Sequence, residues 1–155
     1  MIKRLGLWVI ALSSLAAAPA FAKGWIFSGG MGLTISPDLF LMNPGLEYVH
    51  DSRLTYGPMV QVGVGSGFSL FTFSGTVRYT LGDHPKFKPN LEGGMGLAVA
   101  SGFGSSVGVH IMFGMGFDYK LDNRMSLGTM IRANLAPPMK TFFISWPLIL
   151  FRMHV

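Results

Sequence analysis

Two of the few charged residues in this chain stand where they can pair. Arg78 and Glu92 lie equally far from residue 85, inside the turn-forming segment Gly82-Asp83-His84-Pro85. If antiparallel strands flank that turn, the two side chains face each other on one side of a sheet and form a cross-strand ion pair. Further charged residues on the same face are predicted to extend this pair into a network: Glu47, Asp118, Lys120 and Arg132.

Such a network has two interpretations. Charges enclosed in a low-dielectric interior must be paired, which is a structural role. Alternatively, ion pairs that exchange partners across a narrow lumen would gate a pore.

His110 is the candidate for a catalytic base, since Ser101, Ser105 and Ser106 are close to it in sequence. Nucleophilic catalysis needs a base beside the nucleophile and a group that orients the base. Asp118 follows eight residues later, which is roughly 26 Å along an extended strand. The residues therefore argue against an enzyme.

Methionine gives the same region a second interpretation. Met59, Met112 and Met130 share with His110 the face that carries glycines and polar residues, where they either fill space or line a small cavity for an apolar ligand. The other histidines, His50, His84 and His154, are isolated. No metal site and no cofactor are expected.

The first residues have the three parts of a secretory signal. Lys3 and Arg4 precede an apolar stretch, and Ala20-Phe21-Ala22 supplies a small-x-small cleavage site. We expect residues 1–22 to be a cleaved signal peptide and residues 23–155 to form one domain. The chain has no cysteine, so neither disulfides nor thiol chemistry contribute.

The composition indicates which solvent surrounds the folded domain. Only 12% of residues are charged, about half of the roughly 25% usual in globular proteins, and the mean hydropathy is +0.45. After the signal there is no apolar run of about 18 residues or more, which argues against a helical membrane protein. Removal of Lys3 and Arg4 with the signal lowers the formal net charge from +5 to +3, and this excess is spread over single residues, so nucleic acid is not an expected partner.

Hydrophobicity alternates with period two along most of the chain. Between residues 107 and 120, every odd position is apolar, whereas the even positions carry glycines, His110, Asp118 and Lys120. The pattern predicts eight strands: residues 25–35, 45–51, 56–65, 69–81, 87–100, 107–120, 125–134 and 141–153. The facing of the second and eighth strands stays open, and the eighth is apolar on both faces.

The alternation indicates which face meets which environment. A soluble sandwich or lipocalin-type barrel would place many charged residues on its outer face. Here the non-apolar face holds mostly Gly, Ser and Thr, as a crowded interior does. Since only a closed barrel pairs every backbone group in hydrocarbon, we predict an all-β fold: an eight-stranded antiparallel up-and-down transmembrane β-barrel.

Two hairpin segments resemble a known family. "GMGFDYKLDNRMSLGTMIRAN" (residues 114–134) and, less closely, "VRYTLGDHPKFKPNLEGGMGLA" (residues 77–98) look like the strand-turn-strand units of the small OmpA/OmpX-like outer-membrane barrels. The resemblance implies both termini in the periplasm, periplasmic turns at 52–55, 82–86 and 121–124, and outer loops at 36–44, 66–68, 101–106 and 136–140. The chain departs from the family at its end, Phe151-Arg152-Met153-His154-Val155, where an aromatic assembly signal is common.

These observations predict a small integral outer-membrane protein with a structural role and no catalytic activity. The alternative is a narrow channel or a carrier for a small apolar ligand, and a lipid-modifying enzyme is a further alternative. The expected partners are outer-membrane lipid and, during insertion, the barrel-assembly machinery. The protein is expected to be a monomer.

Overall fold

The computed structural model describes residues 24–102, 104–137 and 141–155, so the expected signal peptide lies outside the described residues. The described chain forms nine antiparallel strands: β1 (Trp25–Ile35), β2 (Leu39–Met42), β3 (Gly45–Val49), β4 (Leu54–Gly65), β5 (Phe68–Thr80), β6 (Phe87–Ser101), β7 (Ser105–Lys120), β8 (Met125–Ala136) and β9 (Thr141–His154). In this part of the chain, no helix is long and apolar enough to cross a membrane.

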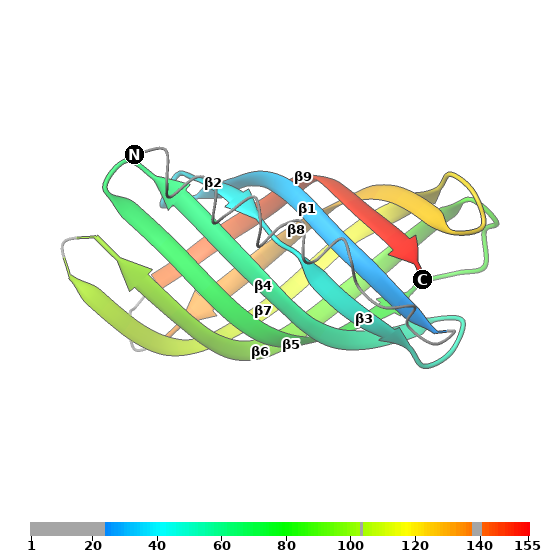
Figure 1. Cartoon of the computed structure of the whole chain (residues 1–155), viewed down its shortest axis with the longest axis horizontal. Coiled ribbons are helices and arrows are strands. Elements are labelled where there is room, and N and C mark those ends of the chain that lie inside the picture. Colours follow the sequence, from blue (N-terminus) through cyan, green and yellow to red (C-terminus); the bar gives the residue numbers. More distant parts are fainter. Residues whose placement is uncertain (1–23, 103, 138–140) are drawn as a thin grey trace, which may run out of the picture.

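The nine strands occupy eight positions of a closed barrel (Figure 1). Both β2 and β3 pair with β1 on one side and with β4 on the other, so they are two halves of one strand. Asn43 and Pro44 separate the halves, because a proline has no N–H to donate to the ladder. β1 also pairs with β9, which closes the sheet. The predicted eight-stranded up-and-down barrel is confirmed.

The first connection is shorter than expected. The predicted loop at 36–44 is a turn of residues 36–38, after which β2 begins at Leu39. The segment Leu39-Phe40-Leu41-Met42 is apolar on both faces, so it shows no alternation of apolar and polar residues that would mark a strand. Leu39 and Leu41 nevertheless point inward and Phe40 outward.

The other connections also differ by a few residues. β4 already starts at Leu54, because the Asp51 carboxylate accepts the backbone N–H groups of Arg53 and Leu54 and completes the turn early. β5 starts at Phe68, β6 extends to Ser101, β7 starts at Ser105 and β8 extends to Ala136. The turns expected at 82–86 and 121–124 lie between strands as predicted, and residues 138–140 of the last expected loop are outside the described part.

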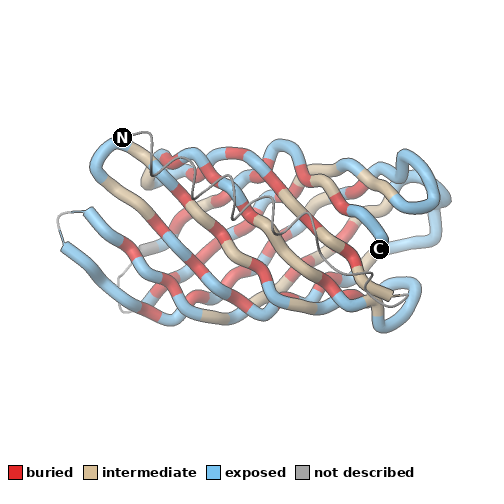
Figure 2. Tube along the Cα trace, viewed as in Figure 1, coloured by how far each residue is buried: buried red, intermediate tan, exposed pale blue. Residues whose placement is uncertain are grey.

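Burial alternates along the strands, as Figure 2 shows by colour. On β5, for example, Thr72, Ser74 and Thr76 are buried, whereas Phe71 and Phe73 are exposed on the outside. β5, β6 and β7 pair over their lengths without a register shift. The expected outer and inner faces are therefore the observed ones, and in β3 Glu47 faces inward and Tyr48 outward.

β9 contains a bulge that changes its phase. Its register shifts against both neighbours, between Gly128 and Arg132 of β8 and between Met31 and Leu33 of β1. Leu148 and Ile149 consequently both face outward. The bulge includes Pro147, which could not donate to a regular ladder. Strict alternation could not have assigned this strand.

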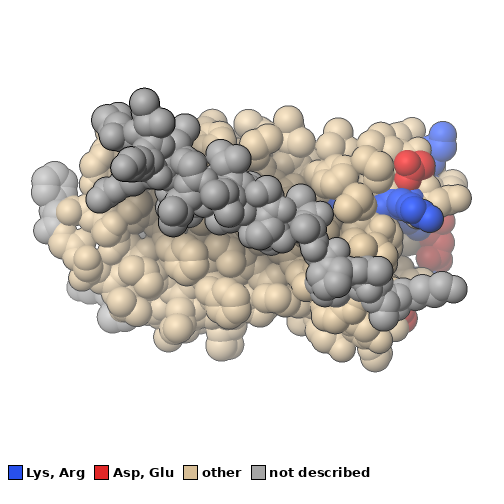
Figure 3. Space-filling model, in the orientation of Figure 1, with Lys and Arg blue, Asp and Glu red and all other residues tan. Residues whose placement is uncertain are grey.

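The two ends of the barrel differ in charge. β1 starts and β9 ends at the same end, called here the terminal end, on the right in Figure 1. On the face visible in Figure 3, charged side chains gather at this end. Towards the opposite end, the lumen is filled by an apolar cluster: Leu39, Leu70, Ala100 and Phe143, with Phe68 packed against them.

Candidate functional site: the charged and hydrogen-bonded lumen

Arg78 is the centre of an ion-pair network inside the barrel. It faces Glu92 directly across the β5–β6 ladder, and its Nε and Nη2 donate to Glu92 Oε2 at 3.0 and 2.6 Å. The other oxygen of Glu92 accepts from Arg132 Nε at 2.6 Å. One carboxylate therefore holds two arginines from strands that are not adjacent.

The network continues towards the terminal end through Arg152. Its Nη2 donates to Glu47 Oε2 at 2.6 Å and its Nη1 to Asp118 Oδ2 at 2.9 Å. Arg78 lies within ion-pair distance of both carboxylates, 3.9 Å from Glu47 and 3.5 Å from Asp118. Three arginines thus face three carboxylates. The group is neutral, and its side chains are at most 9% exposed.

The structure brings together five charged residues that the sequence suggested: Glu47, Arg78, Glu92, Asp118 and Arg132. Lys120 was also suggested, but it is exposed at the end of β7 and makes no ion pair with this group. Arg152 was missed, because the phase of its strand was undecided. The available signal was its charge, since an arginine in an otherwise apolar strand is most stable facing the lumen.

A second group of polar side chains surrounds His110. Ser74 Oγ lies 2.7 Å from His110 Nδ1, and His110 Nε2 lies 3.0 Å from Asn134 Oδ1. The amide nitrogen of Asn134 donates to the carbonyls of Arg132 and Phe143 and to Ser145 Oγ. The Asn134 oxygen must then be an acceptor. In a neutral imidazole this makes His110 Nε2 the donor and Nδ1 the acceptor of the Ser74 hydroxyl proton.

This chain of hydrogen bonds has the order nucleophile, base and orienting amide, but it is closed to solvent. Ser74, His110 and Asn134 are each 0% exposed. The serines that the sequence placed near His110 are not its partners: Ser101, Ser105 and Ser106 lie exposed at the far end, and Ser101 pairs with Ser69. The Ser74 hydroxyl is therefore closed to solvent on all sides in this structure.

The methionines fill the lumen between these groups. Met59, Met112 and Met130 are buried, and the Met112 sulfur accepts a weak hydrogen bond from Gln61 Nε2 at 3.7 Å. None of the three lines the cavity described below. They pack as space-filling residues, which suits their flexible side chains.

Inward glycines explain how the long side chains reach each other. Gly96 of β6 stands between Ser74 and His110 on the neighbouring strands, and Gly114 of β7 stands between Glu92 and Arg132. In both cases the flanking side chains meet over the glycine. A Cβ at Gly96 would collide with the backbone of Phe73 and Ser74.

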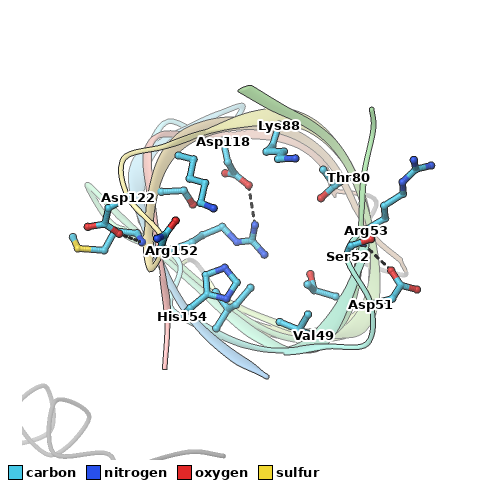
Figure 4. Close-up of a pocket in the computed structure, with 16 residues that line it drawn as sticks. Val49, Asp51, Ser52, Arg53, Thr80, Lys88, Asp118, Asp122, Arg152 and His154 are labelled. Carbon is cyan, nitrogen blue, oxygen red and sulfur yellow. Dashed lines mark hydrogen bonds and ion pairs between the residues drawn. The ribbon is translucent and has the colours of Figure 1, made fainter. Parts of the chain in front are cut away.

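A cavity of about 250 Å³ opens at the terminal end and forms a vestibule above the ion-pair network. Its floor includes Asp118 and Arg152, and its walls include Lys88, Lys120 and His154. Figure 4 shows Lys88, Arg152 and His154 directed into the opening, whereas Asp51 and Asp122 lie at the rim. Among the described residues, no cluster of three His, Cys, Asp or Glu side chains is arranged to hold a metal ion.

Sequence comparison gives no relatives: the chain matches no protein-family model and no curated protein. Solved structures do resemble it. Neisserial surface protein A is 14% identical with a TM-score of 0.69, over 84% of this chain and 96% of that one. The N-terminal β-barrel domain of Pseudomonas aeruginosa OprF is 11% identical with a TM-score of 0.69, over 86% and 98%.

A third similar structure is the outer membrane enzyme PagL, 19% identical with a TM-score of 0.58, over 84% of this chain and 99% of that one. At such low identities the likeness concerns the fold. The fold of this chain is that of the small outer-membrane β-barrels, as the resemblance of its hairpins implied. The three structures carry different names and one is an enzyme, so the shared fold does not assign an activity.

Proposed function

We propose that the chain is a small integral outer-membrane barrel with a structural role in the envelope, no catalytic activity and a sealed lumen. The observation that carries the proposal is the neutral network of three arginines and three carboxylates, which crosses the lumen with its side chains buried. The apolar cluster around Phe143 fills the lumen nearer the opposite end. Nothing of solute size passes two such layers without unfolding them.

The outer surface supports the membrane location. Phe73, Met95, Leu97 and Phe113 are among the many large apolar side chains exposed on the outside of the barrel. At the terminal end, aromatic residues contact one another on the outside, edge to face for Trp25 and Tyr48 and tilted for Tyr48 and Tyr56, with ring centroids 5.3 and 5.6 Å apart. An apolar band bordered by aromatic rings is the surface that a bilayer requires.

We place the terminal end in the periplasm, in accordance with the family resemblance. The barrel-assembly machinery would insert the chain after removal of residues 1–22, and the inserted protein would be a monomer in contact with outer-membrane lipid. The alternatives of a channel, a carrier for an apolar ligand and a lipid-modifying enzyme all need access to the lumen or to Ser74, which the buried layers oppose.

Cell fractionation tests the location, and planar bilayers test the sealed lumen. The protein should be recovered in the outer-membrane fraction and should migrate differently on a gel before and after heating. Reconstituted protein should show no stable unit conductance. Recovery as a soluble periplasmic protein would overturn the architecture, and a reproducible conductance would replace the structural role with the channel.

A charge-conserving replacement is the matched control. The R78K variant keeps a positive charge opposite Glu92 and beside Glu47 and Asp118. If the pair is structural, the variant should remain closed whenever it folds. A gate that depends on the identity of these residues would instead show an altered open probability.

A further inference from the structure

Two positive charges at the terminal end have no role in the lumen network. In the described residues every ion pair has an arginine as its cation, and neither Lys88 nor Lys120 has an acidic partner within 4 Å. Both line the vestibule. An ammonium group is strongly hydrated, so two of them beside one cavity form a positive site that is open to an incoming anion.

The register places the two lysines close together. Lys88 of β6 is directly opposite Asp118 of β7, and Lys120 is two residues further along β7. Diagonal neighbours of this kind on one face have their backbones about 7–8 Å apart, within reach of long side chains. Both ammonium groups can therefore contact a single small ligand.

Among the described residues, no acidic residue of the vestibule forms an ion pair with either lysine. Asp118 faces Lys88; its Oδ2 accepts from Arg152, Arg78 and Asn90, and its Oδ1 is buried without a hydrogen-bond partner. At the rim, Asp51 and Asp122 each accept two backbone N–H groups of their own turns. These hydrogen bonds lower the pKa of both carboxyls, so both stay charged, and at Asp122 the nearby charge of Lys120 adds to the lowering.

Arg152 adds a further positive charge at the floor of the vestibule. Arg152 is only 8% exposed, and its Nε–H has no hydrogen-bond partner in the described structure although both Nη atoms are paired. The Nε atom is itself closed to solvent, so this N–H stays unsatisfied within the network, which costs stability. His154 stands beside it on the same wall.

We propose that this vestibule binds a phosphate group, held by Lys88 and Lys120 above Arg152. The two unpaired ammonium charges match a phosphate dianion, and tetrahedral oxygens can accept from donors on different walls. The cavity of about 250 Å³ is smaller than the roughly 300–1,000 Å³ of pockets for drug-sized ligands. It therefore fits the phosphate itself or one head group. This site goes beyond the structural role and does not depend on whether the lumen is sealed.

Calorimetric titration of inorganic phosphate into the refolded protein tests the site. Dodecyl maltoside is the suitable detergent because it carries no phosphate, and chloride at constant ionic strength controls for general screening. We expect saturable binding by the unmodified protein, weakened about tenfold in K88Q and in K120Q, the effect of one lost charged hydrogen bond.

K86Q is the matched control. Lys86 is an exposed lysine of the 82–86 turn, two residues from Lys88, and does not line the vestibule. Its removal changes the net charge by the same amount and should leave phosphate affinity within a factor of two. Equal weakening in all three variants would mean a general charge effect and would overturn the site.

A second arm separates the two sources of phosphate. Phosphatidylglycerol is added to the same detergent, and retained lipid is counted by native mass spectrometry for the unmodified protein, K88Q and K120Q. Lysine-dependent retention without saturable inorganic phosphate binding identifies a lipid head group, and the converse identifies a solute. Absence of lysine-dependent binding in both arms would overturn the proposal.

Discussion

Arg152 and Glu47 are 105 residues apart in sequence, and their side chains form an ion pair of 2.6 Å inside the lumen. The pair joins the last strand to the second strand position of the barrel, across β1. Arg152 also holds Asp118 of β7, across β8, at 2.9 Å. One side chain near the C-terminus thus fixes three strands that meet only after the barrel has closed.

Replacing this arginine should destabilise the barrel strongly. R152Q leaves the carboxylates of Glu47 and Asp118 buried with one fewer cation, and breaking a buried pair from one side costs about 3–5 kcal/mol. Urea unfolding in lipid vesicles, followed by tryptophan fluorescence, measures the loss. R124Q removes an exposed arginine of the neighbouring turn and should change the stability by no more than about 0.5 kcal/mol. Equal stabilities of the two variants would contradict a structural role for the network.

Two glycines of the same strand should respond in opposite ways to alanine. In G96A the new methyl group collides with the backbone of β5 under the Ser74–His110 hydrogen bond, and such overpacking costs about 1–3 kcal/mol. At Gly93 a Cβ meets nothing within 4 Å, so G93A should be neutral or stabilise by up to about 1 kcal/mol. Comparing the urea midpoints of both variants tests this. A tolerated G96A would mean that the lumen is looser than the structure indicates.

A strand could be predicted from the sequence where apolar and polar residues alternate clearly along it. β5 to β8 alternate cleanly, so their facing and the Arg78–Glu92 pairing could be predicted from residue types and the position of a turn. Leu39–Met42 could not be assigned as β2, because both its faces are apolar and no contrast marks the strand.

The remaining errors have a long-range cause. The partner of His110 is Ser74, 36 residues earlier, and no local spacing relates two residues that meet over a glycine of the intervening strand. Arg152 was missed because its strand is apolar on both faces, which left the facing of the strand undecided, and the bulge in β9 interrupts the alternation as well. The register between strands that are distant in sequence depends on the pairing of the whole closed sheet. A single sequence shows only the pattern within each strand and at each turn.

Ser74 should be unreactive although it is hydrogen-bonded to a histidine. The hydroxyl is 0% exposed, with the ion-pair network and the apolar cluster elsewhere in the same lumen. A fluorophosphonate probe should therefore give no more labelling of the folded protein than of S74A. Labelling that disappears in S74A and in H110A would show an accessible nucleophile and would restore the enzyme as a candidate.

The extra residue in β9 leads to a prediction about a deletion. Between Ser145 and Leu150 the strand has one residue more than β8 has between Arg132 and Gly128. Between Trp146 and Ile149 it has one residue more than β1 has between Leu33 and Met31. Removing Leu148 would thus restore regular pairing on both sides, with Ile149 outward and Leu150 and Arg152 inward. Pro147 lacks the N–H that a regular ladder needs, so the deletion is combined with Pro147→Val.

The combined variant should fold, keep its heat-dependent gel migration and still depend on Arg152. Adding R152Q to it should cost about the same 3–5 kcal/mol as in the unmodified protein, since the ion pairs are kept. Deleting Phe113 is the control, because β7 pairs with β6 and β8 without a bulge there. That deletion moves every inward residue on one side of it to the lipid face, and it should prevent folding. If the Leu148 deletion fails as completely as the Phe113 deletion, the bulge is required for closure and does more than set the phase of Arg152.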